Sequence, residues 1–125
     1  MALGYTSLWG GDPQDLSAEE VIGAWRQLLP GFDATQHLTG PIVASVGDDG
    51  ASCATTVRDY HTVIEDGRTS VWMVAGRYRT SLVRSSDGWR IDGITLTVSH
   101  ESGGSGAGRG DAEAGGCRRR GTDAF

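Results

Sequence analysis

The chain has 125 residues, which is enough for one domain with its own core and too few for two. Its 16 acidic residues outnumber 11 basic ones, and the resulting net charge of −5 argues against nucleic acid as a partner. Every basic residue is an arginine, which excludes Schiff-base catalysis by a lysine and the lysine of a P-loop.

The chain also has no run of apolar residues long enough to cross a membrane and no leading segment of the signal-peptide type. We therefore expect a soluble, cytoplasmic protein without a membrane partner. Cys53 and Cys117 are too few and too far apart for a disulfide framework or a thiolate metal site.

The first two predicted elements are a short strand and one helix. Residues 5–9 form an apolar and β-branched run, which predicts a strand, and Gly and Pro at 10–13 end it. Ser17 and Glu20 then have the spacing of a capping box, which places the start of a helix over 17–29. Its apolar residues fall on one face, which we expect to pack on a sheet: Val21, Ile22, Trp25, Leu28 and Leu29.

The rest of the ordered chain has the pattern of β-structure. Gly- and Asp-rich turn signals at 47–50, 65–68 and 86–88 separate four β-rich runs. These runs predict consecutive antiparallel strands over about 35–46, 51–64, 69–84 and 89–99. The two middle strands are long, so the sheet is expected to bend or coil.

Residues 101–125 differ from the remainder of the chain. Glycine is frequent there, and Phe125 is the only large apolar residue. Such a segment cannot bury enough surface to offset the entropy of ordering it. We therefore divide the chain into a folded domain over 1–100 and a disordered tail over 101–125.

Few residues have the chemistry of a catalytic site. Asp59 and His61 lie two apart on one predicted strand and share a face, so a carboxylate stands beside an imidazole, as in a tuned general base. Alternatively, both side chains point to solvent, or Asp59 only satisfies a partly buried His61. Cys53 has no adjacent base in sequence and is interpreted as a small buried hydrophobe. The histidines have no metal-ligand spacing and there is no nucleotide-binding glycine motif, so we expect neither metal nor cofactor.

Several motifs together resemble a known family. These are Tyr5-Thr6-Ser7-Leu8, the helix of 17–29, Ala34-Thr35-Gln36-His37-Leu38, Gly76-Arg77-Tyr78, and Asp87-Gly88-Trp89-Arg90-Ile91. In this order they resemble the SnoaL-like and scytalone dehydratase-like branch of the nuclear transport factor 2-like superfamily. The resemblance covers about residues 3–100. It implies an α+β fold with a cone-shaped, strongly curved, mainly antiparallel sheet and a packed helix.

The resemblance also implies roles for individual residues. His37 matches the histidine of a Thr-Gln-His motif, and His61 matches a second active-site histidine, within a gap of one residue. Tyr5 matches a tyrosine that polarises the substrate carbonyl through a water. In that family these groups remove water from a cyclic, ketone-like substrate without a cofactor. The family's N-terminal helices, which carry its catalytic aspartate, have no counterpart here, so the domain is expected to be incomplete at its N-terminus; Asp59 is a candidate substitute.

Three functions stay open at this stage. The first is a cofactor-independent lyase of the dehydratase type, or an isomerase, acting on a small, cyclic, mostly apolar ligand such as a polyketide. The second is a non-catalytic small-molecule-binding domain, and the third is an inactive truncated remnant. We further expect a homo-oligomer, because the sheet would be under-covered. Finally, we expect His37 and His61 to lie opposite each other across the first long hairpin, with Tyr5 at the edge of their cavity.

Overall fold

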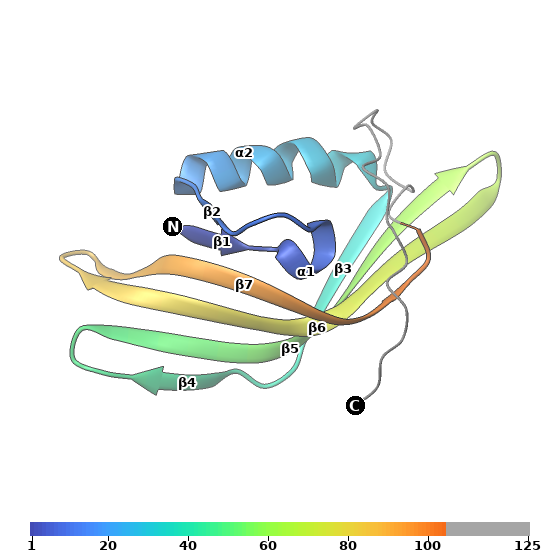
Figure 1. Ribbon diagram of the computed structural model, residues 1–125. Helices are drawn as coiled ribbons and strands as arrows, with labels where there is room; N and C mark the ends of the chain where they lie inside the picture. Colours follow the sequence, from blue (N-terminus) through green and yellow to red (C-terminus); the bar gives the residue numbers. More distant parts are fainter. Residues whose placement is uncertain (105–125) are drawn as a thin grey trace.

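The structure, a computed structural model, describes residues 1–104. Helices and strands follow one another from β1 to β7 in the order shown in Figure 1. Their bounds are β1 Ala2–Gly4, α1 Thr6–Trp9, β2 Gln14–Asp15, α2 Ala18–Leu28, the 3-10 helix η1 Leu29–Gly31, β3 Ala34–Thr39, β4 Val43–Val46, β5 Gly50–Glu65, β6 Arg68–Ser85 and β7 Gly88–Ser102.

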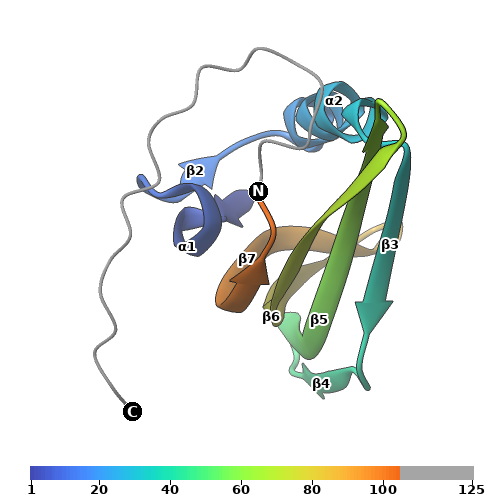
Figure 2. The same ribbon diagram turned by 90° about the vertical axis from the view of Figure 1, so that its right-hand side faces the viewer.

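The described strands form one sheet in the order β2-β1-β7-β6-β5-β3, and β4 also pairs with β5. All pairings are antiparallel except that of β1 with β7. The sheet curves around the N-terminal elements, with α2 lying above its concave face (Figures 1 and 2). This confirms the predicted α+β fold with a strongly curved, mainly antiparallel sheet.

The hairpin between β5 and β6 illustrates why the turn signals were informative. Asp66 and Gly67 adopt φ values of 50° and 71°, as the two central residues of a type I′ turn require. Glycine meets that requirement without steric cost, and aspartate tolerates it better than most residues do. The turn therefore fixes the antiparallel pairing of the two longest strands from its tip inward.

Helix α2 begins with the predicted capping box. The Ser17 hydroxyl accepts a hydrogen bond from the Glu20 backbone N–H, and the Glu20 carboxylate accepts one from the Ser17 N–H. The expected packing of the helix on the sheet is only partly correct. Val21 is buried, whereas Ile22, Trp25 and Leu29 stay more than one-third exposed, because a cavity lies beneath much of the helix.

Two predicted strands differ from the observed elements. The run 5–9 forms helix α1 instead of a strand, since a run of five residues is too short for periodicity to distinguish the two. The N-terminal strand that pairs with β7 is β1, which lies directly before residues 5–9 in the chain. The predicted strand 35–46 is divided into β3 and β4, because Pro41 has no N–H to donate and interrupts the pairing.

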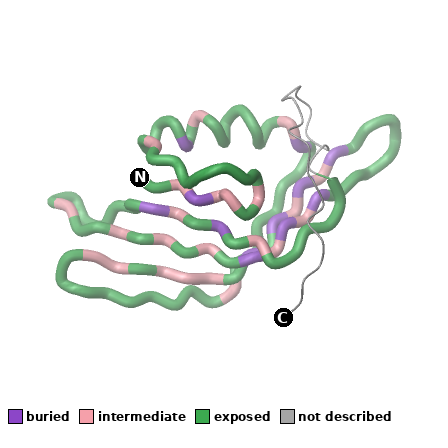
Figure 3. Tube along the Cα trace, viewed as in Figure 1, coloured by how far each residue is buried: buried purple, intermediate pink, exposed green. Residues whose placement is uncertain are grey.

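The buried residues lie mainly in the long strands beneath α1 (Figure 3). Six of the buried apolar residues form one cluster, with partly buried Tyr5, Leu8, Tyr78 and Val98 packed against it. Its members are Phe32, Val57, Val63, Trp72, Val74 and Leu96. Trp72 is 2% exposed and is the largest fully buried side chain among the described residues. The core is therefore concentrated where the sheet meets the N-terminal elements.

The boundary of the domain lies slightly beyond the predicted one. Strand β7 continues to Ser102, and the Trp72 indole N–H donates a hydrogen bond of 2.7 Å to the Glu101 carboxylate. Glu101 therefore belongs to the sheet and not to the tail, because a partner on the neighbouring strand holds it. The remainder of the predicted tail, 105–125, lies outside the described residues. Over residues 1–104, no helix is long and apolar enough to span a membrane.

Candidate functional site

A cavity of about 580 Å³ lies between the concave face of the sheet and the N-terminal elements. Its volume falls within the range typical of small-molecule sites. Most of its wall is apolar, and its polar side chains come from the sheet, from Tyr5 and Thr6 at the start of α1, and from Asp12 just before β2. The wall includes Leu3, Tyr5, Leu8, Trp9, Trp25, Leu28, Leu29, Thr55, Asp59, His61, Trp72, Val74, Tyr78, Thr80, Ile94 and Leu96.

Strand β5 supplies two of these polar groups, a carboxylate and an imidazole. Its odd-numbered positions from 57 to 63 are buried and face the cavity side, so Asp59 and His61 project together as the sequence predicted. The Asp59 side chain is 5% exposed and His61 is 7% exposed as a residue. The interpretation that both point to solvent is therefore wrong.

A β-bulge brings His37 to the same face. Along β4 the pairing joins Val43 to Ala54, whereas along β3 it joins His37 to Asp59, a register one residue different. Pro41 and Ile42 stand against Thr55 alone, which is the arrangement of a β-bulge. Without the extra residue, His37 would lie opposite Tyr60 and point to the other face.

His37 and His61 are thus diagonal neighbours and not direct partners. Their ring centroids are 5.4 Å apart, and His37 Nδ1 lies 3.6 Å from Asp59 Oδ1. The predicted direct opposition is wrong, because His61 pairs with Thr35. The His37 side chain is 46% exposed, and the cavity wall formed by residues 1–104 does not include it.

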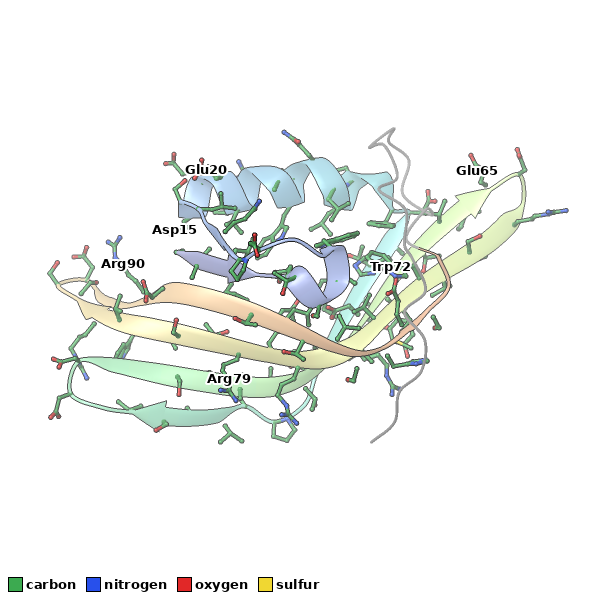
Figure 4. All side chains as sticks on the ribbon, in the orientation of Figure 1. Asp15, Glu20, Glu65, Trp72, Arg79 and Arg90 are labelled. Atoms are coloured by element: carbon green, nitrogen blue, oxygen red, sulfur yellow. The ribbon has the colours of Figure 1, made fainter. Side chains whose placement is uncertain are left out.

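Aromatic rings enclose the His61 imidazole. The Trp72 and Phe32 ring centroids lie 4.7 Å and 4.9 Å from its centroid, and the Trp9 ring packs against Trp72 with centroids 5.6 Å apart. Figure 4 shows Trp72 beside α1, and its ring also lines the cavity. The imidazole therefore lies in apolar surroundings that hold its ring in place.

Two tyrosines meet near the carboxylate. The Tyr5 hydroxyl donates a hydrogen bond of 3.2 Å to the Tyr78 hydroxyl, which comes from β6. Tyr5 is held by the turn that follows it: the Ser7 hydroxyl donates to the Leu96 carbonyl at 2.6 Å and accepts from the Val98 N–H at 3.0 Å. The Ser7 side chain thus links α1 to β7. Because Tyr5 directly precedes α1, this link also holds Tyr5 in position.

Burial leaves two polar atoms without partners. Asp59 Oδ1 and His61 Nδ1 have no hydrogen bond within the described residues. Buried polar groups are nearly always satisfied, and exceptions occur preferentially at functional sites. A ligand with a donor or an acceptor at the right position could therefore satisfy both atoms.

The same burial shifts the acid–base properties of the site. Desolvation raises the pKa of Asp59 above its ordinary 3.8, although the nearby His37 and His61 act in the opposite direction. Desolvation lowers the pKa of His61 below its ordinary 6.5, and the nearby charge of His37 lowers it further. At neutral pH His61 is therefore a neutral imidazole beside a carboxyl group that is more basic than usual.

Both tyrosines are shifted in the direction that keeps their protons. Burial raises the pKa of Tyr5, and burial together with the hydrogen bond from Tyr5 raises the pKa of Tyr78 beyond the usual tyrosine range. The two hydroxyls are therefore hydrogen-bond donors over the whole physiological pH range. Donors of this kind can stabilise negative charge that develops on a ligand oxygen.

The structure brings Tyr5, Asp59 and His61 into one cavity and places His37 against Asp59, outside its wall. Tyr78 also lines the cavity and was not among the predicted site residues. Its inward-facing position could have been inferred, since alternate residues of β6 from Trp72 to Leu82 face the cavity side. The chemistry of a lone tyrosine in a strand gave no further signal.

Within residues 1–104, no three His, Cys, Asp or Glu side chains converge as metal ligands would. Cys53 is a free cysteine on the same inward-facing positions of β5, and it is half-buried. It is not part of the cavity wall formed by the described chain.

The comparisons with known proteins agree with this architecture. A family model described as a SnoaL-like domain matches residues 5–95. The crystal structure of the Kfla4162 protein from Kribbella flavida superposes with a TM-score of 0.74 at 29% identity, covering 82% of this chain and 71% of that one. A "putative aromatic ring hydroxylase" from Novosphingobium aromaticivorans superposes with a TM-score of 0.66 at 20% identity, covering 85% of this chain and 72% of that one. No curated protein matches at a significant level.

Proposed function

Because the chain belongs to the SnoaL-like family, we propose that it is a cofactor-independent lyase or isomerase acting on a small, cyclic, mostly apolar molecule. The observation that supports this most is the convergence of Asp59, His61 and the Tyr5–Tyr78 pair in one largely apolar cavity. Perturbed acids and bases in a cleft are a recognised mark of catalytic sites. The neighbour named as an aromatic ring hydroxylase is 20% identical to this chain, and that similarity concerns the fold alone.

The proposed reaction starts with removal of a proton next to a ketone carbonyl. A neutral His61 accepts this proton, and the electron pair moves onto the carbonyl oxygen. Tyr78 donates a hydrogen bond to that oxygen, and Tyr5 in turn donates to Tyr78. A positioned base of this kind contributes roughly 10²–10⁴-fold to a rate.

The second half of the reaction distinguishes a lyase from an isomerase. With a hydroxyl group one carbon further on, the electron pair returns and expels that group, which takes the proton from the imidazolium and leaves as water. Without such a hydroxyl, the proton returns to a different carbon and the product is an isomer. Asp59 stabilises the positive imidazolium between the two steps, since its carboxylate lies on the same face of β5.

The test uses a β-hydroxytetralone, which loses water to give a fluorescent naphthol. Catalysed release of naphthol, or incorporation of deuterium from D₂O next to the carbonyl, would support the proposal. We expect His61→Gln and Asp59→Asn to lower either rate by roughly 10²-fold or more. The matched control is His100→Gln, because His100 is exposed on β7 and lies outside the cavity wall.

The apolar lining also favours a second candidate, a non-catalytic domain that binds the same class of ligand. In that case the tetralone would perturb Trp fluorescence on binding, with neither deuterium exchange nor loss of water. Binding that persists in Asp59→Asn without any exchange in the parent protein would contradict the catalytic proposal and support this one.

A further inference from the structure

The face of the sheet that points away from α2, hereafter the outer face, carries three arginines close together. Arg58 on β5 pairs with Ala75, and Arg77 and Arg79 on β6 follow at alternate positions. Paired residues and alternate residues share a face, so all three guanidinium groups project from the outer face. All three residues are exposed, and Figure 4 shows Arg79 on the side opposite α2.

No acidic residue balances these arginines on the outer face. None of the paired outward positions of β3 to β7 within the described chain is Asp or Glu. Asp92 is exposed and stands unpaired in the β-bulge between Ile91 and Gly93. The ion pairs formed among residues 1–104 involve none of the three arginines. Since the chain as a whole has a net charge of −5, this positive patch is segregated from an otherwise acidic surface.

Small, uncharged residues lie between the arginines, and Leu38 on β3 and His100 on β7 stand on either side of the Arg58–Ala75 pair. Thr56, Ala75 and Thr97 stand beside them in the pairing of β5, β6 and β7. A shallow depression of about 410 Å³ adjoins Arg58. It is lined by Leu38, Thr39, Gly40, Thr56, Val57, Arg58, Ala75, Gly76 and Ser99. The outer face thus combines positive charge with a depression that could accommodate a side chain of a partner.

We propose that the outer face docks an acidic segment of a partner protein, with its carboxylates on Arg58, Arg77 and Arg79. Arginine is suited to this role because its planar guanidinium forms two parallel hydrogen bonds with a carboxylate. Three arginines on a chain of negative net charge are too few for the phosphate contacts of a nucleic-acid site. A two-fold pairing centred on the arginines would bring those of the two copies against one another.

This docking surface is independent of the proposed reaction, since the cavity opens on the opposite face of the sheet. A homo-oligomer that forms together with this docking would use other surfaces. Exposed apolar residues for such contacts are available at the sheet edge, where Ile42, Val43 and Val46 are each more than 60% exposed.

The experiment measures binding of a fluorescein-labelled oligoglutamate peptide by fluorescence anisotropy at low salt, with oligoglutamine as the reference peptide. We expect the full chain to bind oligoglutamate and not oligoglutamine, with affinity falling as salt is added. The triple variant Arg58→Gln, Arg77→Gln, Arg79→Gln should lose about 10-fold or more in affinity, equivalent to about 1.4 kcal/mol. The matched control changes the net charge equally at three other arginines, Arg26→Gln, Arg68→Gln and Arg84→Gln, and should stay within about 2-fold of the parent.

Several outcomes would overturn the proposal. Equal losses in the two triple variants would mean that the peptide responds to net charge and not to the outer face. Tighter binding of a single-stranded oligonucleotide than of oligoglutamate would identify a different class of partner. A dimer that sedimentation detects in the parent, and that the outer-face variant alone abolishes, would make a second copy the occupant. Near-ultraviolet circular dichroism of both variants confirms that each remains folded.

Discussion

The two walls of the cavity are built in different ways. The sheet wall carries Asp59, His61 and Trp72, all of them buried and held by strands that pair over most of their length. The helix wall carries Trp25, Leu28 and Leu29, each about 40% exposed and directed towards the cavity. This contrast in burial indicates that the sheet holds the reactive groups in place, while the helix offers apolar surface that a ligand could cover.

Truncating one tryptophan on each wall tests this comparison with the largest expected effect. Trp72→Ala should destabilise the protein by about 3–5 kcal/mol, because it leaves a cavity in the core and removes the hydrogen bond to Glu101. Trp25→Ala should cost less than about 1 kcal/mol, because Trp25 is 38% exposed, and should weaken ligand binding instead. Chemical denaturation of both variants checks the difference, and similar losses of stability would contradict it.

The attachment of α1 to the sheet wall depends on one hydroxyl. Ser7→Ala leaves the Leu96 carbonyl and the Val98 N–H without their partner, and we expect a loss of about 2 kcal/mol. The matched control is Ser99→Ala, whose hydroxyl makes one longer bond, 3.3 Å to the Ala75 carbonyl, and which should cost at most about 0.5 kcal/mol. Thermal melts compare the two, and equal shifts would show that Ser7 has no special role in holding α1.

A smaller effect is expected at Asp59, where a substitution should increase the stability of the protein and not decrease it. The folded-state pKa of this carboxyl is raised, so the native state binds its proton more tightly than the unfolded chain, and stability is lost as pH rises through that window. Asp59→Asn removes the buried charge and should gain about 1 kcal/mol at pH 7–8. The gain should disappear below the ordinary pKa of 3.8. Melting temperatures across this pH range measure it, and destabilisation at pH 8 would contradict the assignment.

The smallest effect concerns His61, whose contribution to stability depends on pH in the opposite direction to that of Asp59. Its folded-state pKa is lowered, so the unfolded chain binds more protons, and stability is lost as pH falls from the ordinary value of 6.5 towards the lowered one. His61→Gln cannot be protonated and should lose less stability over that interval, by a fraction of about 1 kcal/mol. Proton NMR of the imidazole checks the same point directly: a His61 pKa above 6.5 would contradict the shift.

Part of the site was predictable from residue spacing alone. Asp59 and His61 are two residues apart on a strand, and that spacing places them on one face whatever the strand pairs with. Which face is buried was left open by the spacing, and the structure decides it: Val57 and Val63 on the same face are buried with them. Tyr78 was not predicted, since its contact with Tyr5 joins residues 73 positions apart in the sequence.

The position of His37 shows most clearly what spacing could not settle. Its face depends on the register of β3 with β5, and a change of one residue would send the side chain to the outer face. The bulge formed by Pro41 and Ile42 against Thr55 sets that register, and the Thr55 hydroxyl secures it by donating to the Gly40 carbonyl at 2.9 Å. The turn at 47–50 predicts the hairpin but does not reveal the bulge.

The local features of this protein follow from the amino-acid sequence: the capped helix, the turns at the hairpin tips, the shared face of Asp59 and His61 on β5, and the resemblance to the family. Each of these depends on a few neighbouring residues with well-defined conformational preferences. The tertiary structure alone decided that residues 6–9 form a helix, that Tyr5 meets Tyr78, that His37 approaches Asp59, and that three arginines gather on the outer face. These features depend on strand register and on contacts between distant segments, which are selected by the packing of the whole chain.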